Sequence, residues 1–99
     1  MKVDIPGQGW IIARYGAEAQ TTIHMEECAE LIQAISKMRR ARAAGRDDAK
    51  AHDNLVEEMA DVLICMEQIK EIYGINTCEI QDMINTKCLR QEARMYDPY

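Results

Sequence analysis

Residues 23–37, IHMEECAELIQAISK, decide the fold, because they have the apolar spacing of an amphipathic helix and yet place acidic side chains within the apolar stripe. Successive residues of a helix are rotated by about 100°, so Glu27 lies between Ile23 and Leu31, and Glu30 lies at the edge of the same stripe. Carboxylates usually occupy the solvated side of a helix. Two glutamates on a face that should meet another helix therefore need a function or a partner.

The composition indicates helices rather than sheet. The 99-residue chain has seven Met, four Tyr, one Trp and no Phe, so its core is built mainly from aliphatic and sulfur side chains. No stretch alternates with the two-residue period of a strand. A chain this short forms one domain at most and buries only about two thirds of its unfolded surface, so a partner subunit would help to complete the core. We therefore expect an all-α single domain over residues 1–99.

Charge and cysteine content argue against several classes of protein. The formal net charge is −5, whereas a protein that binds nucleic acid by neutralising phosphates presents an excess of cations. The first residues contain no apolar run long enough for a signal or membrane segment. The cysteines show no CxxC spacing and lie mostly among apolar residues, which predicts reduced thiols in the core. They are Cys28, Cys65, Cys78 and Cys88. We expect a cytoplasmic protein with neither a membrane nor a nucleic-acid partner.

Turn and cap residues divide the chain into one short and three long helices. The short leading helix is predicted within WIIARYG, residues 10–16, where Gly16 ends it. The long helices are expected over 17–44, with Gly45 as the stop, from Asp47 or Asp48 to Gly74, and from Asn76 to about Met95. Glu79 stands three residues after Asn76, as in a capping box. The predicted fold is a small helical bundle.

The second long helix repeats the pattern of the first. Glu58 lies on the face of Cys65 and Asp61 lies at its edge, whereas Glu57 points away. Between residues 55 and 66, apolar residues surround nearly the whole helix. Because such a helix is covered on more than one side, we expect oligomerisation to complete the bundle, as a homodimer or a dimer of dimers.

Either acidic pair alone would most often be a solvated helix face. Two pairs on facing apolar stripes instead bring four carboxylates into a partly dry space, where like charges repel unless protons or cations intervene. Oxygen ligands without His or Cys select Mg²⁺ or Mn²⁺. A di-iron bundle would need a glutamate three residues before a histidine, and the residues three before His24 and His52 are Thr21 and Ala49. The sequence therefore favours a site for Mg²⁺ or Mn²⁺ over a di-iron site.

The third long helix carries the opposite charge. Lys87, Arg90 and Arg94 fall at i, i+3 and i+7 and form one stripe. By itself, such a stripe is typical of a solvated basic edge near a helix C-terminus. Together with two acidic pairs, it is able to bind a triphosphate that a metal ion holds.

The sequence does not identify a nucleobase. Trp10 and Tyr15 could stack on a base, although an aromatic residue near the N-terminus is more often a core anchor. Gln20 and His24 lie on the face of Glu27 and could contact a ligand. For His24, a satisfied place in the core is the more frequent case.

The segments EECAEL (26–31) and EEMADVL (57–63), with YGAEAQ upstream and INTKCLRQEAR downstream, resemble the MazG-type all-α nucleoside triphosphate pyrophosphohydrolases. The pattern of that family is E-E-x-x-E, a spacer, then E-x-x-D, and the resemblance covers about residues 10–95. It implies that four carboxylates ligate Mg²⁺, namely Glu27, Glu30, Glu58 and Asp61. Glu26 matches the first glutamate of the motif. Lys87 matches a lysine near the phosphates, with Arg90 and Arg94 as looser matches.

Members of that family cleave a nucleoside triphosphate between the α and β phosphorus atoms, which gives the monophosphate and pyrophosphate. The resemblance thus implies an Mg²⁺-dependent hydrolase, with Mn²⁺ as a possible replacement, that serves nucleotide-pool housekeeping. The metal would neutralise phosphate oxygens and lower the pKa of the attacking water. Glu26 and Glu27 are the nearest candidates to accept its proton. The alternative is a non-catalytic helical module that binds a nucleotide or a protein.

Overall fold

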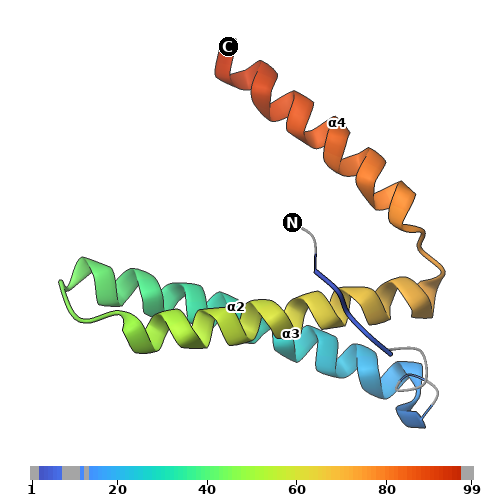
Figure 1. Cartoon of the computed structure of the whole chain (residues 1–99), viewed down its shortest axis with the longest axis horizontal. Coiled ribbons are helices and arrows are strands. Elements are labelled where there is room, and N and C mark those ends of the chain that lie inside the picture. Colours follow the sequence, from blue (N-terminus) through green and yellow to red (C-terminus); the bar gives the residue numbers. More distant parts are fainter. Residues whose placement is uncertain (1–2, 8–11, 13, 97–99) are drawn as a thin grey trace.

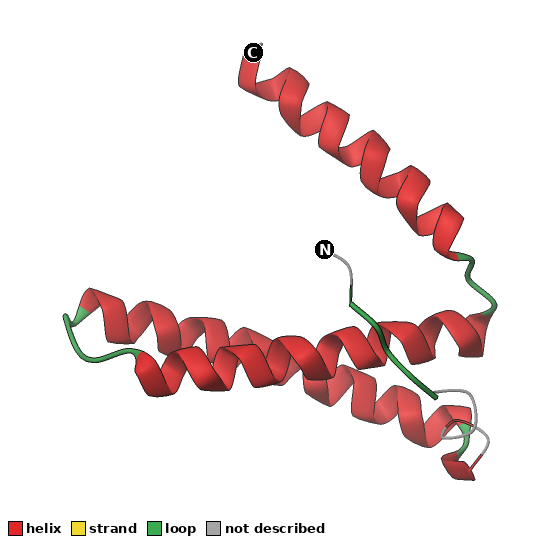
Figure 2. Ribbon diagram, viewed as in Figure 1, coloured by secondary structure: helices red, strands yellow, loops and turns green. Residues whose placement is uncertain are grey.

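The computed structural model describes residues 3–7, 12 and 14–96, and helix is the only regular structure in this part of the chain (Figure 2). Three long helices follow one another, α2 (Ala17–Ala43), α3 (Ala49–Tyr73) and α4 (Thr77–Tyr96). The all-α fold class and the three long helices are confirmed. None of the described helices combines the length and the apolar character that crossing a bilayer requires.

The helices α2 and α3 form an antiparallel hairpin, and α4 leaves the end of α3 and points away from both (Figure 1). The Cα radius of gyration is 17.0 Å, whereas a compact chain of this length has a radius of about 13 Å. None of the α4 residues is buried. Within one chain the third long helix therefore does not close the bundle, and its closure by oligomerisation stays a prediction.

Gly45 ends α2 as the sequence predicts. It has a φ of 64°, a left-handed conformation that glycine adopts without steric cost. The Arg46 amide donates to the Ala41 carbonyl at 3.0 Å, and the Gly45 amide donates to the Arg42 carbonyl at 3.1 Å. This pair of bonds is a Schellman motif, which satisfies the last carbonyls of the helix. The chain can therefore reverse direction immediately after α2.

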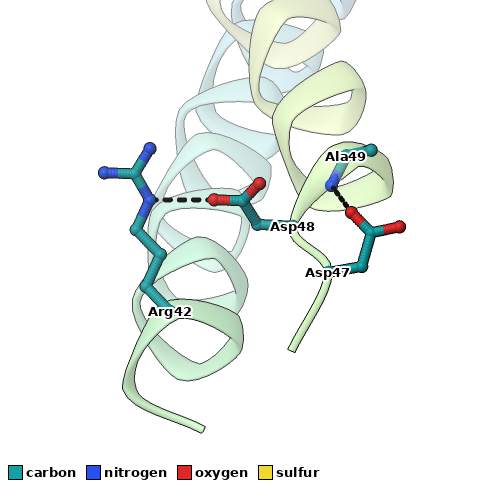
Figure 3. A network of polar contacts seen from close by, with 4 residues as sticks. All are labelled: Arg42, Asp47, Asp48 and Ala49. Atoms are coloured by element: carbon teal, nitrogen blue, oxygen red, sulfur yellow. Dashed lines mark hydrogen bonds and ion pairs between the residues drawn. The ribbon is translucent and has the colours of Figure 1, made fainter. Parts of the chain in front are cut away.

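Two aspartates organise the return into α3 (Figure 3). The Ala49 amide donates to Oδ1 of Asp47 at 3.1 Å. Asp48 accepts from Nε of Arg42 at 2.9 Å, which links the end of α2 to the beginning of α3. The ion pair is solvent-exposed, so its contribution to stability is small. The ion pair mainly holds the end of α2 close to the beginning of α3.

A capping box begins α4. The Cys78 amide donates to Oδ1 of Asn76, and the Asn76 amide donates to Oε2 of Glu79, both at 2.7 Å. The predicted partnership of Asn76 and Glu79 is confirmed. These reciprocal bonds satisfy amides that the first turn of a helix cannot satisfy by itself.

Only part of the predicted leading helix can be followed. Ile12, Arg14 and Tyr15 are helical, and the Gly16 amide donates to the Ile12 carbonyl at 2.8 Å. Trp10 lies outside the described residues, so this short helix as a whole stays a prediction.

The core of a single chain is small. Ala34 at 0% exposure and Cys65 at 5% are the buried apolar residues among those described. Large apolar side chains remain exposed around the middle of α3, and they include Val56, Met59, Ile64 and Met66. The prediction of four core cysteines is wrong for three of them in the single chain, because Cys28, Cys78 and Cys88 are exposed. All four thiols are free.

Candidate metal centre

Three carboxylates meet where α2 and α3 face each other. Glu27 comes from α2, and Glu58 and Asp61 come from α3. Each of them offers an oxygen, and these oxygens all lie within 4.8 Å of one another. The face-to-face arrangement follows from the sequence pattern, because each residue sits in or beside the apolar stripe that its helix presents to the other.

Two oxygens of this cluster have no hydrogen-bond donor that would compensate for their burial. Oε2 of Glu27 and Oε2 of Glu58 are shielded from solvent and have no hydrogen-bond partner among the described residues. A buried polar atom without a partner is destabilising. The cluster is therefore incomplete as a purely structural feature.

The pKa values of the carboxylates also indicate that the cluster is incomplete by itself. Burial, followed by the charges of Asp61 and Glu30, raises the pKa of Glu27 from 4.5 to about 7. The pKa of Glu58 is also raised, first by burial and then by the charges of Glu30 and Asp61. Carboxylates in such a place hold protons or bind a cation.

The other two acidic residues from α2 lie at the margin of the cluster. Glu30 is exposed, yet it is close enough to raise the pKa of both Glu27 and Glu58. Glu26 is exposed and lies outside the group of three converging carboxylates. The structure thus brings Glu27, Glu58 and Asp61 together, with Glu30 beside them.

Buried polar side chains continue the α2–α3 interface beyond the carboxylates. Nε2 of His24 and Oε1 of Gln68 are 2.7 Å apart, and both residues are buried. Gln20 is buried as well. His24 therefore lies in the core, but it is satisfied only at Nε2, because its shielded Nδ1 atom has no hydrogen-bond partner among the described residues. No pattern in the sequence points to Gln68, because a glutamine at a helix interface cannot be told from a surface glutamine by spacing alone.

Cys65 lies beside the cluster. Burial, followed by the charges of Glu27 and Cys28, raises the pKa of the Cys65 thiol to about 11. The thiol therefore stays protonated at neutral pH and acts as a small apolar side chain rather than a metal ligand.

The predicted phosphate-binding residues are not part of this cluster. Lys87, Arg90 and Arg94 are exposed on α4, where they and Gln91 line a shallow hollow of about 130 Å³. They form one surface, as their spacing predicts, but α4 does not pack on the hairpin that carries the carboxylates. Tyr15, a candidate to stack on a base, is 63% exposed.

The donor set fits a hard divalent cation. All converging atoms are carboxylate oxygens, which are the ligands that Mg²⁺ and Mn²⁺ prefer. A cation would satisfy the two shielded oxygens and compensate the mutual repulsion of the carboxylates. The fold and the site together define an all-α protein with a carboxylate centre built between two helices.

Comparison with known protein families assigns residues 16–94 to the MazG nucleotide pyrophosphohydrolase domain. This match covers most of the chain, so the protein belongs to that family. The members of the family are generally nucleoside triphosphate pyrophosphohydrolases that use a divalent metal. Comparisons with curated proteins and with solved structures find no match.

Proposed function

We propose that the protein hydrolyses nucleoside triphosphates to nucleoside monophosphates and pyrophosphate, with Mg²⁺ bound by Glu27, Glu30, Glu58 and Asp61. The observation that carries this proposal is the pair of shielded carboxylate oxygens without partners, on two helices of a MazG-family domain. Mn²⁺ has the same ligand preference and would replace Mg²⁺. The cellular role proposed is housekeeping of the nucleotide pool in the cytoplasm.

The carboxylates have two tasks in this reaction. Together they would hold the cation, which would neutralise charge on the phosphate oxygens and lower the pKa of water. Glu27 or the adjacent Glu26 accepts the proton from the water that attacks the α phosphorus. The bond between the α phosphorus and its bridging oxygen then breaks, and pyrophosphate leaves.

A homodimer or a dimer of dimers completes the site. The arm formed by α4 buries none of its residues in one chain, and its basic stripe lies away from the carboxylates. In the oligomer, Lys87, Arg90 and Arg94 of one protomer bind the phosphates at the carboxylate centre of its partner. The exposed apolar residues of α3 supply the contact between protomers.

The proposal is tested with a panel of ribo- and deoxyribonucleoside triphosphates in the presence of Mg²⁺, with the products separated. Cleavage at the α phosphorus gives the monophosphate and pyrophosphate, whereas attack at the γ phosphorus gives the diphosphate and orthophosphate. Glu58→Gln keeps the shape of the side chain but removes a ligand charge, so it should abolish turnover. Glu57→Gln is the matched control, because Glu57 is exposed on the same helix and is not one of the converging carboxylates.

Two results would overturn the proposal. Equal activity of the wild-type protein and Glu58→Gln would show that the metal ligands are wrong. Nucleotide binding without turnover of any triphosphate would instead indicate a non-catalytic nucleotide-binding module.

A further inference from the structure

Positive charge is concentrated at the connected end of the hairpin, within residues 37–50. This segment holds six of the 12 cationic residues and two of the 17 carboxylates, whereas the rest of the chain holds six cations and 15 carboxylates. The six cations are Lys37, Arg39, Arg40, Arg42, Arg46 and Lys50. Among the described residues, Arg42 is the one member of this group that forms an ion pair. A cationic end on an anionic protein attracts an anion.

Two of these cations flank one hollow between the helices. Lys37 of α2 and Lys50 of α3 line it together with Ala51 and Asn54, and its volume is about 330 Å³. Small-ligand sites have volumes of about 300–1,000 Å³, so the hollow is large enough for a small anion. Neither ammonium group has an ion-pair partner in the described part of the chain.

The wall from α3 lies in one row with a residue of the carboxylate centre. Lys50, Asn54 and Glu58 follow one another in steps of four residues, so they form a single row along one side of the helix. Each step corresponds to a rise of about 6 Å. Along this row the side chains change from a metal-binding carboxylate through a half-buried amide to a cation.

Along the wall from α2, the side chains also change from a carboxylate to a cation. Lys37 follows Glu30 by seven residues, which places both on one side of the helix at an axial separation of about 10 Å. A long side chain on a helix covers the turn that precedes its own Cα atom. This rule directs the side chain of Lys37 toward Glu30 and that of Lys50 away from Glu58, so Lys50 lines the end of the hollow farther from the carboxylates.

We propose that Lys37, Lys50 and Asn54 form the subsite for the β and γ phosphates of the substrate. This assignment rests on the proposed function, because it takes the α phosphate to lie at the metal centre. The two ammonium groups neutralise the terminal phosphates, and the Asn54 amide donates a hydrogen bond to them. Unlike the stripe on α4, this subsite belongs to the same chain as the carboxylates, and it holds the part of the substrate that leaves as pyrophosphate.

The test measures binding of pyrophosphate by calorimetry in the presence of Mg²⁺. Lys37→Gln and Lys50→Gln should each weaken pyrophosphate binding about tenfold, which is the loss expected for one hydrogen bond to a charged group. Each should raise KM for the triphosphate by a similar factor and leave binding of a nucleoside monophosphate unchanged. Arg46→Gln is the control, because it removes one charge from the same end of the hairpin but does not line the hollow. Circular dichroism verifies that all variants are folded.

The outcomes separate this subsite from the proposed function. Wild-type turnover with unchanged pyrophosphate binding in both lysine variants would overturn the subsite alone. Loss of pyrophosphate binding in both lysine variants, with no turnover by the wild-type protein, would support the subsite and reject the proposed hydrolysis. An equal loss in Arg46→Gln would reduce the effect to general charge and would also overturn the subsite.

Discussion

The hairpin of α2 and α3 and the arm formed by α4 use similar helical patterns with opposite results. In the hairpin, each apolar stripe meets its partner, and every buried residue in the described part of the chain lies on α2 or α3. In α4 none is buried, although the helix has a well-formed capping box. A helix can therefore be specified locally by its sequence while its packing partner is specified elsewhere. The two helices of the hairpin pack on each other within one chain, and we expect the arm to pack on another protomer.

The largest effect that would distinguish the two regions is catalytic complementation. Glu58→Gln in the hairpin and the double change Lys87→Gln, Arg90→Gln in the arm should each lower kcat/KM by about 100-fold or more, as removal of a charged group at a reaction centre does. Mixed dimers would then contain one site with an intact centre and an intact arm. After exchange of subunits, statistical pairing in a twofold dimer should restore about a quarter of the wild-type activity.

Two measurements are needed to interpret that experiment. Light scattering establishes that the wild-type protein is an oligomer at micromolar concentration, and mass spectrometry establishes that mixed dimers have formed. Mixed dimers without recovered activity would place the arm and the carboxylates of each site in the same chain.

Mg²⁺ should stabilise the hairpin strongly, because it binds the folded cluster and relieves the repulsion among its carboxylates. At a concentration of about 100 times its dissociation constant, a ligand of the folded state contributes about 2.7 kcal/mol. For a domain of this size we expect Tm to rise by about 10 °C. Differential scanning calorimetry in EDTA and in saturating Mg²⁺ measures the shift. An equal shift in Glu27→Gln would place the bound ion outside the cluster.

Without metal, the same cluster should make stability fall as the pH rises. The pKa of Glu27 is about 7 in the folded protein and near its ordinary value of 4.5 in the unfolded chain, so between these values only the folded state holds the proton. Its contribution to stability is complete below about pH 4.5 and is lost as the pH rises through about 7. In EDTA, wild-type Tm should therefore decrease between about pH 5.5 and pH 8. Glu27→Gln should show a smaller decrease, and an unchanged slope would contradict the assignment.

The buried polar pair offers a smaller effect that is confined to the hairpin. Gln68→Leu removes the partner of Nε2 of His24 and leaves that atom unsatisfied in the interface, at a cost of about 1–3 kcal/mol. The matched control is Gln81→Leu in α4, where the glutamine donates to Asn85 at 3.0 Å on an exposed surface. Chemical denaturation should show a clear loss for the first variant and almost none for the second. Similar losses would mean that the arm is packed as tightly as the hairpin.

The sequence predicts the parts of this molecule that depend on local chemistry. Gly45 and the pairing of Asn76 with Glu79 specify helix ends through bonds within a few residues. The convergence of Glu27 and Glu58 also follows from periodicity, because two apolar stripes joined by a short connection have to face each other. These features were predictable because each has a single favourable geometry.

Features that depend on the choice of partner were not predictable in the same way. The periodicity of α4 shows that one face is apolar, but it does not distinguish packing on the same chain from packing on another protomer. The exposure of Cys28 depends on which side of α2 is covered, for the same reason. The hollow between Lys37 and Lys50 forms only because of how the two helices are aligned with each other. The spacing of side chains within one helix does not predict that alignment.

The smallest effect that we predict concerns the cap of the arm. Asn76→Ala removes the side-chain oxygen that accepts from the Cys78 amide, and loss of such a cap costs about 1 kcal/mol. Most of the stability of a helix in a protein comes from tertiary packing, so for an arm without buried residues that cost is a large part of its helical stability. Hydrogen exchange should become faster in the first turns of α4 and stay unchanged in α2 and α3. If the arm is secured by a partner protomer, the difference should grow on dilution below the dissociation constant of the oligomer. Faster exchange throughout the hairpin would show that the two regions unfold as one unit.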